Sequence, residues 1–181
     1  MRVSDPIKED HRELESYYHQ IIKATDNDTK TRYQNQFTWE LARHSIAEEL
    51  LIYPIMEKKV EGGKEKADRD REEHRKIKEL LKQFQNLDAS EGLFLTTIEG
   101  LMRDLRQHTK EEEEDDLPAL ERVLSVEESD ELSKSFERTK MLTPTRSHPS
   151  APDKPPFETV VGLMAAPIDH VADLFRKFPK E

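Results

Sequence analysis

Apolar residues recur every three or four positions along four stretches of the chain, a spacing that predicts four amphipathic helices. Ser4 or Asp5 would cap the first helix, and Gly62-Gly63 would end the second. Because the connections are short, we expect an all-α fold, an antiparallel up-and-down four-helix bundle. The expected helices lie at about residues 6–24, at about 30–60, around 67–84, and from Asp88 or Ser90 to beyond Glu112.

The last third of the chain has a different pattern. Ser125 to Glu128 read as a capping box for a short helix, and seven of the ten prolines lie between Pro144 and Pro179. The run Thr143 to Pro156 is predicted to be extended, and Val160 to Phe175 to be weakly amphipathic and partly helical. We expect this Pro-rich tail to pack along the bundle or to hold a protein partner. The predicted division is a four-helix bundle over residues 1–124 and a C-terminal extension over residues 125–181.

Composition narrows the classes of partner and compartment. Charged residues make up 38% of the chain, and the net charge is -10, which disfavours binding to nucleic acid and to anionic lipid. The N-terminal residues contain no apolar signal region, and no run approaches the roughly 18 apolar residues of a membrane span. The absence of cysteine excludes disulfides, zinc-thiolate sites and iron–sulfur clusters. We therefore expect a cytoplasmic protein that binds neither nucleic acid nor membranes.

Four histidines and two glutamates on the apolar stripes carry the chemistry of the chain. On a helix, a spacing of four places His and Glu one turn apart on the same face. Counting residues at about 1.5 Å each places all six at one depth of the bundle. Burying them without compensation would cost several kcal/mol, so the sequence predicts a dinuclear metal centre. The candidate ligands are His11, His44, Glu48, His74, His108 and Glu112.

An internal repeat supports this interpretation. The residues around His11 recur around His74, 63 positions later, and those around His44 recur around His108, 64 positions later. Such self-similarity indicates a duplicated helical hairpin. Each hairpin would supply two histidines and one carboxylate, and a pseudo-twofold axis would relate two metal half-sites.

Nitrogen and oxygen ligands without thiolate suit iron, manganese or zinc. Glu48 and Glu112 can bridge, which leaves positions for an oxo or hydroxo bridge and for a small ligand such as dioxygen. A carboxylate-bridged pair with open positions most favours iron.

The pattern resembles the hemerythrin-like, or HHE cation-binding, family. The resemblance covers residues 5 to about 124, in particular the runs Asp10 to Leu14, Arg43 to Pro54 and Gln107 to Pro118. It implies a non-haem di-iron centre in a family whose members bind oxygen, sense iron or oxygen, handle nitric oxide or peroxide, or store iron.

One position departs from the oxygen-carrying members of that family. They have H-x-x-x-H on the third helix, whereas the residue four positions after His74 is Lys78. The second metal would lack one imidazole, which argues against reversible oxygen carriage. Substitute ligands could be Glu15, Asp70 or Tyr18.

Several residues keep two interpretations. A single histidine on an apolar stripe is usually a hydrogen-bonded core residue, and only the set of six reverses that expectation. Pro54 and Pro118 either kink their helices or break them. The acidic run Glu111 to Asp116 is a solvated face, apart from Glu112, or a funnel for cations. The histidines assigned to the surface or tail are His19, His148 and His170.

Three functions fit the sequence. The first is a binding and redox module whose di-iron site handles or senses oxygen, iron or a small oxidant. The second is a metal-dependent oxidoreductase that consumes peroxide or nitric oxide, or a hydrolase that uses a metal-bound hydroxide. The third is an interaction protein in which the metal is structural and the Pro-rich tail recruits a partner. No catalytic residue is assigned, because the chain shows no further base or nucleophile constellation.

Overall fold

Helices form the regular structure of the described residues, which confirms the predicted all-α class. The computed structural model describes residues 1–151, 153 and 157–180, and for residues 157–164 it describes the backbone only. No strand occurs in this described part of the chain. The elements are α1 (Ser4–Lys23), α2 (Asn27–Ala47), η1 (Glu48–Ile52), α3 (Tyr53–Lys59), α4 (Gly63–Asn86), α5 (Phe94–Glu111), η2 (Glu112–Asp116), α6 (Leu117–Val123), α7 (Val126–Lys140) and α8 (Phe157–Asp173).

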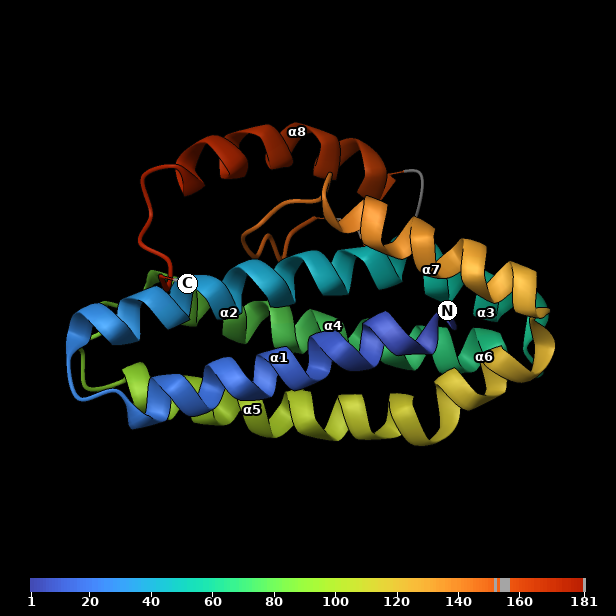
Figure 1. Cartoon of the computed structure of the whole chain (residues 1–181), viewed down its shortest axis with the longest axis horizontal. Helices are drawn as coiled ribbons and strands as arrows, with labels where there is room; N and C mark the ends of the chain where they lie inside the picture. Colours follow the sequence, from blue (N-terminus) through green and yellow to red (C-terminus); the bar gives the residue numbers. More distant parts are fainter. Residues whose placement is uncertain (152, 154–156, 181) are drawn as a thin grey trace.

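The long helices α1, α2, α4 and α5 lie side by side (Figure 1). α1 packs against α2 and α5, and α4 also packs against α2 and α5. α7 contacts α2 and α1, and in Figure 1 α8 runs along the outside, over the segment that follows α7. The last residues return to the N-terminal turns of α2, where Arg32 donates a hydrogen bond to the carbonyl of Phe178 (2.8 Å).

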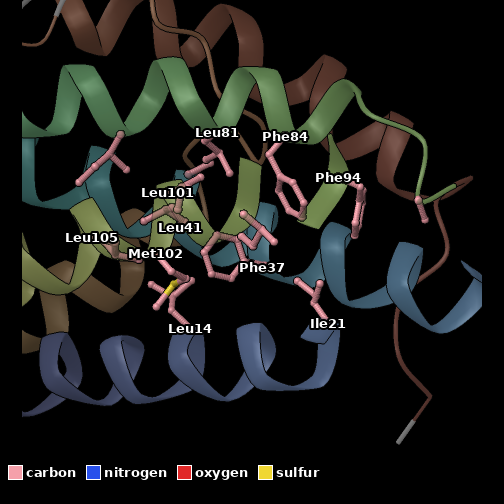
Figure 2. Close-up of a cluster of buried hydrophobic side chains, with 14 residues drawn as sticks. Leu14, Ile21, Phe37, Leu41, Leu81, Phe84, Phe94, Leu101, Met102 and Leu105 are labelled. Carbon is pink, nitrogen blue, oxygen red and sulfur yellow. The ribbon is translucent and has the colours of Figure 1, made fainter. Parts of the chain in front are cut away.

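One cluster of buried apolar side chains joins α1, α2, α4 and α5. Figure 2 shows these side chains pointing toward one another from the surrounding helices. The ring of Phe84 is central, because its centroid lies 6.2 Å from that of Phe37 and 5.0 Å from that of Phe94. The side-chain amide of Gln34 donates to the carbonyls of Phe84 and Leu87 and so satisfies the C-terminal end of α4.

A second apolar cluster lies toward the other end of the helices. It combines the N-terminal residues with η1, α3, α6 and α7, and its members include Val3, Ile7, Ile52, Tyr53, Met56, Leu117, Leu120 and Phe136. Along each of the continuous helical runs 4–23, 27–59, 63–86 and 94–123, the predicted histidine falls between residues of the first cluster and residues of the second. The six candidate ligands therefore occupy a layer between two apolar clusters.

Each of the helical runs 27–59 and 94–123 contains one π-helical turn just before a proline. The backbone N–H of Tyr53 donates to the carbonyl of Glu48, and that of Leu117 donates to the carbonyl of Glu112, both over five residues. Proline has no N–H, and its ring clashes with the carbonyl four residues earlier, which a widened turn relieves. The helices therefore continue through Pro54 and Pro118 and do not break there.

Two predicted helix starts are wrong. Val3 occupies the cap of α1, and Asp5 instead accepts a hydrogen bond from the N–H of Arg2 (2.8 Å). The helix expected to open at Asp88 or Ser90 begins at Phe94, because the carboxylate of Asp88 binds the N–H and hydroxyl of Ser90 and closes a turn instead. Both carboxylates have an alternative backbone partner nearby, a choice that local propensity does not resolve.

The C-terminal region contains both expected helical segments. The capping box of α7 is confirmed, since Ser125 Oγ accepts from the N–H of Glu128 and the Glu128 carboxylate accepts from the N–H of Ser125. The stretch predicted to be partly helical forms α8. In the Pro-rich run, residues 143–151 and 153 form turns, bends and stretches without assigned structure, and residues 152 and 154–156 lie outside the described residues. Of the helices formed by described residues, none is long and apolar enough to cross a membrane.

Replacing Phe84 with alanine should lower the free energy of unfolding by about 3–5 kcal/mol, because its fully buried ring would leave a cavity between Phe37 and Phe94. Urea titration of the metal-free protein measures this loss. The matched control is Leu93→Ala, which removes a side chain that is 66% exposed and should change stability by less than about 0.5 kcal/mol. Equal effects of the two substitutions would contradict the assignment of Phe84 to the core.

Candidate metal centre

The six candidate ligands come from every long helix and meet in one buried layer. α1, α2, α4 and α5 each supply one histidine, and Glu48 and Glu112 are the first residues of the two π-helical turns. All six side chains are buried. The structure therefore brings together every residue of the predicted ligand set.

Short distances link these side chains into two overlapping groups. Glu48 Oε2 lies 3.2 Å from His44 Nε2 and 3.4 Å from His74 Nε2, so it faces both groups. The first group is His11, His44, Glu48 and Glu112, and the second is Glu48, His74 and His108, with the ligand atoms of each group within 4.8 Å of one another.

Several polar atoms in this layer are buried without a hydrogen-bond partner. They are Nε2 of His11, Nε2 of His44, and both carboxylate oxygens of Glu48 and of Glu112. Buried polar atoms are nearly always hydrogen-bonded, and buried carboxylates are stable only when they are paired. Imidazole nitrogens and carboxylate oxygens are ligands of iron, manganese and zinc. The donor set thus fits metal ions placed among these atoms.

A carboxylate holds the other ring nitrogen of every one of the four histidines. With Nδ1–H donated outward, Nε2 is left with its lone pair facing the centre, which is the tautomer that a metal ligand requires. The Nδ1 contacts are His11 to Glu113 (2.8 Å), His44 to Asp10 (3.0 Å), His74 to Glu49 (3.0 Å) and His108 to Glu73 (2.7 Å).

Sequence reasoning did not identify these four carboxylates as partners of the histidines. A usable signal exists, because each directly adjoins a candidate ligand in the sequence: Asp10 precedes His11, Glu73 precedes His74, Glu49 follows Glu48, and Glu113 follows Glu112. Each pair also obeys the repeat of 63 or 64 residues. Adjacency alone was not sufficient, because the carboxylate next to one histidine binds the imidazole of a different helix.

Tyr53 breaks the internal symmetry and was missed by the sequence interpretation. Its hydroxyl lies 2.9 Å from His74 Nε2, and the side chain is fully buried. The residue 64 positions later is Leu117, which has no polar group. The second group of ligands therefore has a hydroxyl beside it that the first group lacks.

The substitute ligands proposed from the sequence divide into two kinds. Glu15 forms an ion pair with Arg106, and Tyr18 lies under the Arg106 guanidinium (4.9 Å), so neither residue faces the site. Asp70 is buried beside His108 and has one carboxylate oxygen without a partner. Burial, together with the charge of Asp116, raises the pKa of Asp70 to about 7. Asp70 thus stays close to the second group, and Glu15 and Tyr18 do not.

Lys78 occupies the position where oxygen carriers have a further histidine, and it does not point at the ligands. Its Nζ binds the carboxylate of Glu49, which in turn accepts from His74 Nδ1. Lys78 therefore binds the carboxylate behind the candidate ligand His74 and does not face the ligand atoms.

The acidic run differs from the predicted solvated face. Glu113 accepts from His11, and buried Asp116 forms ion pairs with Lys66 and Arg69. Among the residues beyond Glu112, only Glu114 and Asp115 are exposed, in this fully described segment. Glu113 and Asp116 are therefore fixed by partners that only the fold brings close.

The other histidines lie away from the centre. His19 is on the surface, as predicted. His148 pairs with Asp169 (2.9 Å), and His170 donates to the carbonyl of Thr143 (3.1 Å), so both bind within the C-terminal extension.

The electrostatics of the layer favour a cation. Burial, and then the nearby charge of Glu112, raises the pKa of Glu48 well above its usual range. Burial alone would lower the pKa of His11, but the carboxylates of Glu112 and Glu113 outweigh it and raise that pKa to about 9. Burial lowers the pKa of His74 to about 4. A cation among these side chains would relieve the repulsion between the carboxylates of Glu48 and Glu112.

Comparisons with known proteins give one family model and two relatives. Residues 2–120 match the model of the hemerythrin HHE cation binding domain. An uncharacterized hemerythrin-like protein of Schizosaccharomyces pombe is 54% identical over 179 residues, which cover 98% of this chain and 88% of that protein. A protein of Nostoc named DNA nickase is 24% identical over 140 residues, 77% of this chain but only 39% of that protein.

A solved structure shares the fold. It is the crystal structure of a hemerythrin HHE cation binding domain-containing protein from Mycobacterium kansasii, with a TM-score of 0.68. The sequences are 21% identical, and the match covers 78% of this chain and 86% of that one. At this identity the likeness supports the helical fold alone.

The stability of the metal-free protein should fall as the pH rises from 6.5 to 9. His11 has a higher pKa in the folded state than its ordinary 6.5, so its stabilisation is complete below pH 6.5 and is lost as the pH passes through about 9. The loss is on the order of 1.4 kcal/mol for each pKa unit. His74 titrates below this range.

Urea unfolding of chelator-treated protein at pH 6.5, 7.5 and 9 measures this dependence. His11→Gln removes the titrating group and should flatten the profile. A native profile that rises between pH 6.5 and 9, or an unchanged slope in the variant, would contradict the assignment.

Proposed function

Because the chain belongs to the hemerythrin HHE cation-binding family, we propose that its buried layer holds two non-haem iron ions and that the centre handles or senses oxygen, iron or a small oxidant. One observation carries this proposal. Six buried nitrogen and oxygen atoms of His11, His44, Glu48 and Glu112 converge without hydrogen-bond partners, although carboxylates hold the far side of every histidine. The proposed ligands are His11, His44, Glu48, His74, His108 and Glu112.

The ligands divide between two ions. We assign His11 and His44 to the first ion and His74 and His108 to the second, since these pairs belong to different groups. Glu48, which belongs to both groups, and its repeat partner Glu112 are the proposed bridges. Iron held by imidazole and carboxylate would supply redox chemistry and would bind a small ligand such as dioxygen.

Residues of the chain account for the selectivity of such a site. The carboxylates on Nδ1 fix each imidazole in its ligating tautomer. The apolar clusters on both sides of the layer exclude bulk water, which favours a small ligand over a large one. The hydroxyl of Tyr53 is the polar group available to hydrogen-bond a ligand beside His74.

We assign the architecture as an antiparallel up-and-down four-helix bundle over residues 1–124 with a C-terminal extension over residues 125–181. The mutual packing of α1, α2, α4 and α5 supports the bundle. Leu132 and Phe136 of α7 belong to the second apolar cluster, so the extension shares its core with the bundle.

A second candidate function is a metal-dependent oxidoreductase that consumes peroxide or nitric oxide. Tyr53 favours it, because a buried phenol beside the site can donate a proton or a hydrogen bond to a reacting ligand. Peroxide-consumption assays on the iron-loaded chain separate this function from binding without turnover.

Protein purified without added metal should contain about two iron atoms per chain by elemental analysis. Glu48→Ala and Glu112→Ala should each lower the content to one or less, because each removes a proposed bridge. The matched control is Glu114→Ala, which removes an exposed carboxylate from the same π-helical turn as Glu112 and should retain both ions. Zinc or manganese in place of iron would overturn the choice of metal, and a native chain without any transition metal would overturn the proposal.

Replacing Tyr53 with phenylalanine should leave the iron content unchanged and weaken the binding of azide about tenfold. That factor corresponds to about 1.4 kcal/mol, the scale of one hydrogen bond to a charged ligand. Titration of the visible absorption with azide measures the affinity. Tyr33→Phe, at a partly buried tyrosine of the first apolar cluster, should bind azide as the native chain does. Loss of iron from Tyr53→Phe would instead make the phenol a ligand.

A further inference from the structure

The C-terminal extension places one buried cation behind the metal centre. Lys140, the last residue of α7, has a side chain that is only 5% exposed. Its Nζ lies 2.5 Å from Asp10 Oδ1 and 2.8 Å from Glu40 Oε1. A lysine buried to this extent needs carboxylate partners, and Asp10 and Glu40 supply them.

Asp10 connects this lysine directly to a proposed ligand. One oxygen of Asp10 binds Lys140, and the other accepts from His44 Nδ1 at 3.0 Å. Phe136 from the same helix packs its ring edge-on against the His44 ring, with centroids 6.0 Å apart. α7 therefore forms the wall behind His44 with an apolar ring and a charge.

A similar arrangement lies behind His74. Lys78 binds Glu49, whose other oxygen accepts from His74 Nδ1. The extension holds this lysine too, because Ser147 Oγ donates to the backbone carbonyl of Lys78 (2.6 Å). By contrast, the carboxylates behind the other two histidines are partly exposed, with Glu113 at 34% and Glu73 at 26%. Each proposed ion would thus bind one histidine whose Nδ1 is held by a carboxylate that also pairs with a lysine.

The charge behind an imidazole changes its strength as a donor. A carboxylate that accepts the Nδ1–H raises the basicity of Nε2 and so favours the more oxidised state of a bound metal. A cation on the second oxygen of that carboxylate withdraws negative charge and opposes the effect. Lys140 therefore acts on His44 in the direction that favours the reduced state.

We propose that Lys140 is a positioning residue through which the C-terminal extension raises the reduction potential of the metal centre. This inference rests on the proposed di-iron function. It assigns the extension a role beyond covering the helices, because displacement of α7 would remove the cation from Asp10 and change the state of the iron at a given external potential.

The test is a redox titration of the full iron-loaded chain, followed by visible absorption with dithionite and mediators. Lys140→Met should lower the reduction potential of the centre. At an applied potential equal to the midpoint of the native chain, the ratio of oxidised to reduced iron should therefore rise severalfold. Tenfold would correspond to 59 mV for a one-electron step. Lys140→Arg keeps the charge and should stay closer to the native potential.

Lys134→Met is the matched control, since it removes an exposed lysine from the same helix. It should leave the potential unchanged. Asp10→Asn should shift the potential in the opposite direction, upward, because it removes the carboxylate and leaves an amide oxygen to accept from His44. Opposite shifts from these two neighbours are not expected if the pair only stabilises the fold.

Equal potentials for Lys140→Met, Lys134→Met and the native chain would overturn the inference. If Lys140→Met fails to fold, the potential of Asp10→Asn tests the inference in its place. An unchanged potential in Asp10→Asn would also overturn the inference. Failure of the proposed function gives a different result, because the native chain would then contain no iron to titrate.

Discussion

The structure depends on how four imidazoles and two carboxylates are accommodated in one layer between apolar clusters. Burying such groups is unfavourable by several kcal/mol unless each polar atom has a partner. Carboxylates from neighbouring helices satisfy every Nδ1, and the remaining atoms face a common centre where a cation would complete the balance. The packing of the helices and the orientation of the histidines therefore depend on each other, because each carboxylate binds the histidine of another helix.

The two π-helical turns carry the two glutamates of this layer. Each begins at a glutamate of the ligand set and ends just before a proline, so the widened turn occurs where the ligand must point inward. In η1, the consecutive residues Glu48 and Glu49 are both buried, one facing the centre and one behind His74.

The internal sequence repeat accounts for the equivalent residues of the layer, and departures from the repeat account for its asymmetry. Asp10 and Glu73 play equivalent parts, as do Glu49 and Glu113. Tyr53 has no equivalent, and one lysine behind the layer comes from α7, outside the repeat. Departures of this kind give the two groups of candidate ligands different surroundings, and such surroundings tune the chemistry of a metal site.

The sequence alone determined the helical class and the set of six inward residues, because apolar periodicity and a four-residue spacing act within single helices. Tertiary structure decided which side chains meet across helices. Glu113 reaches His11, and Tyr53 reaches His74, through packing that no local pattern encodes. Lys140 lies 130 residues from Asp10 in the chain, so only the folded position of α7 could bring the two charges together.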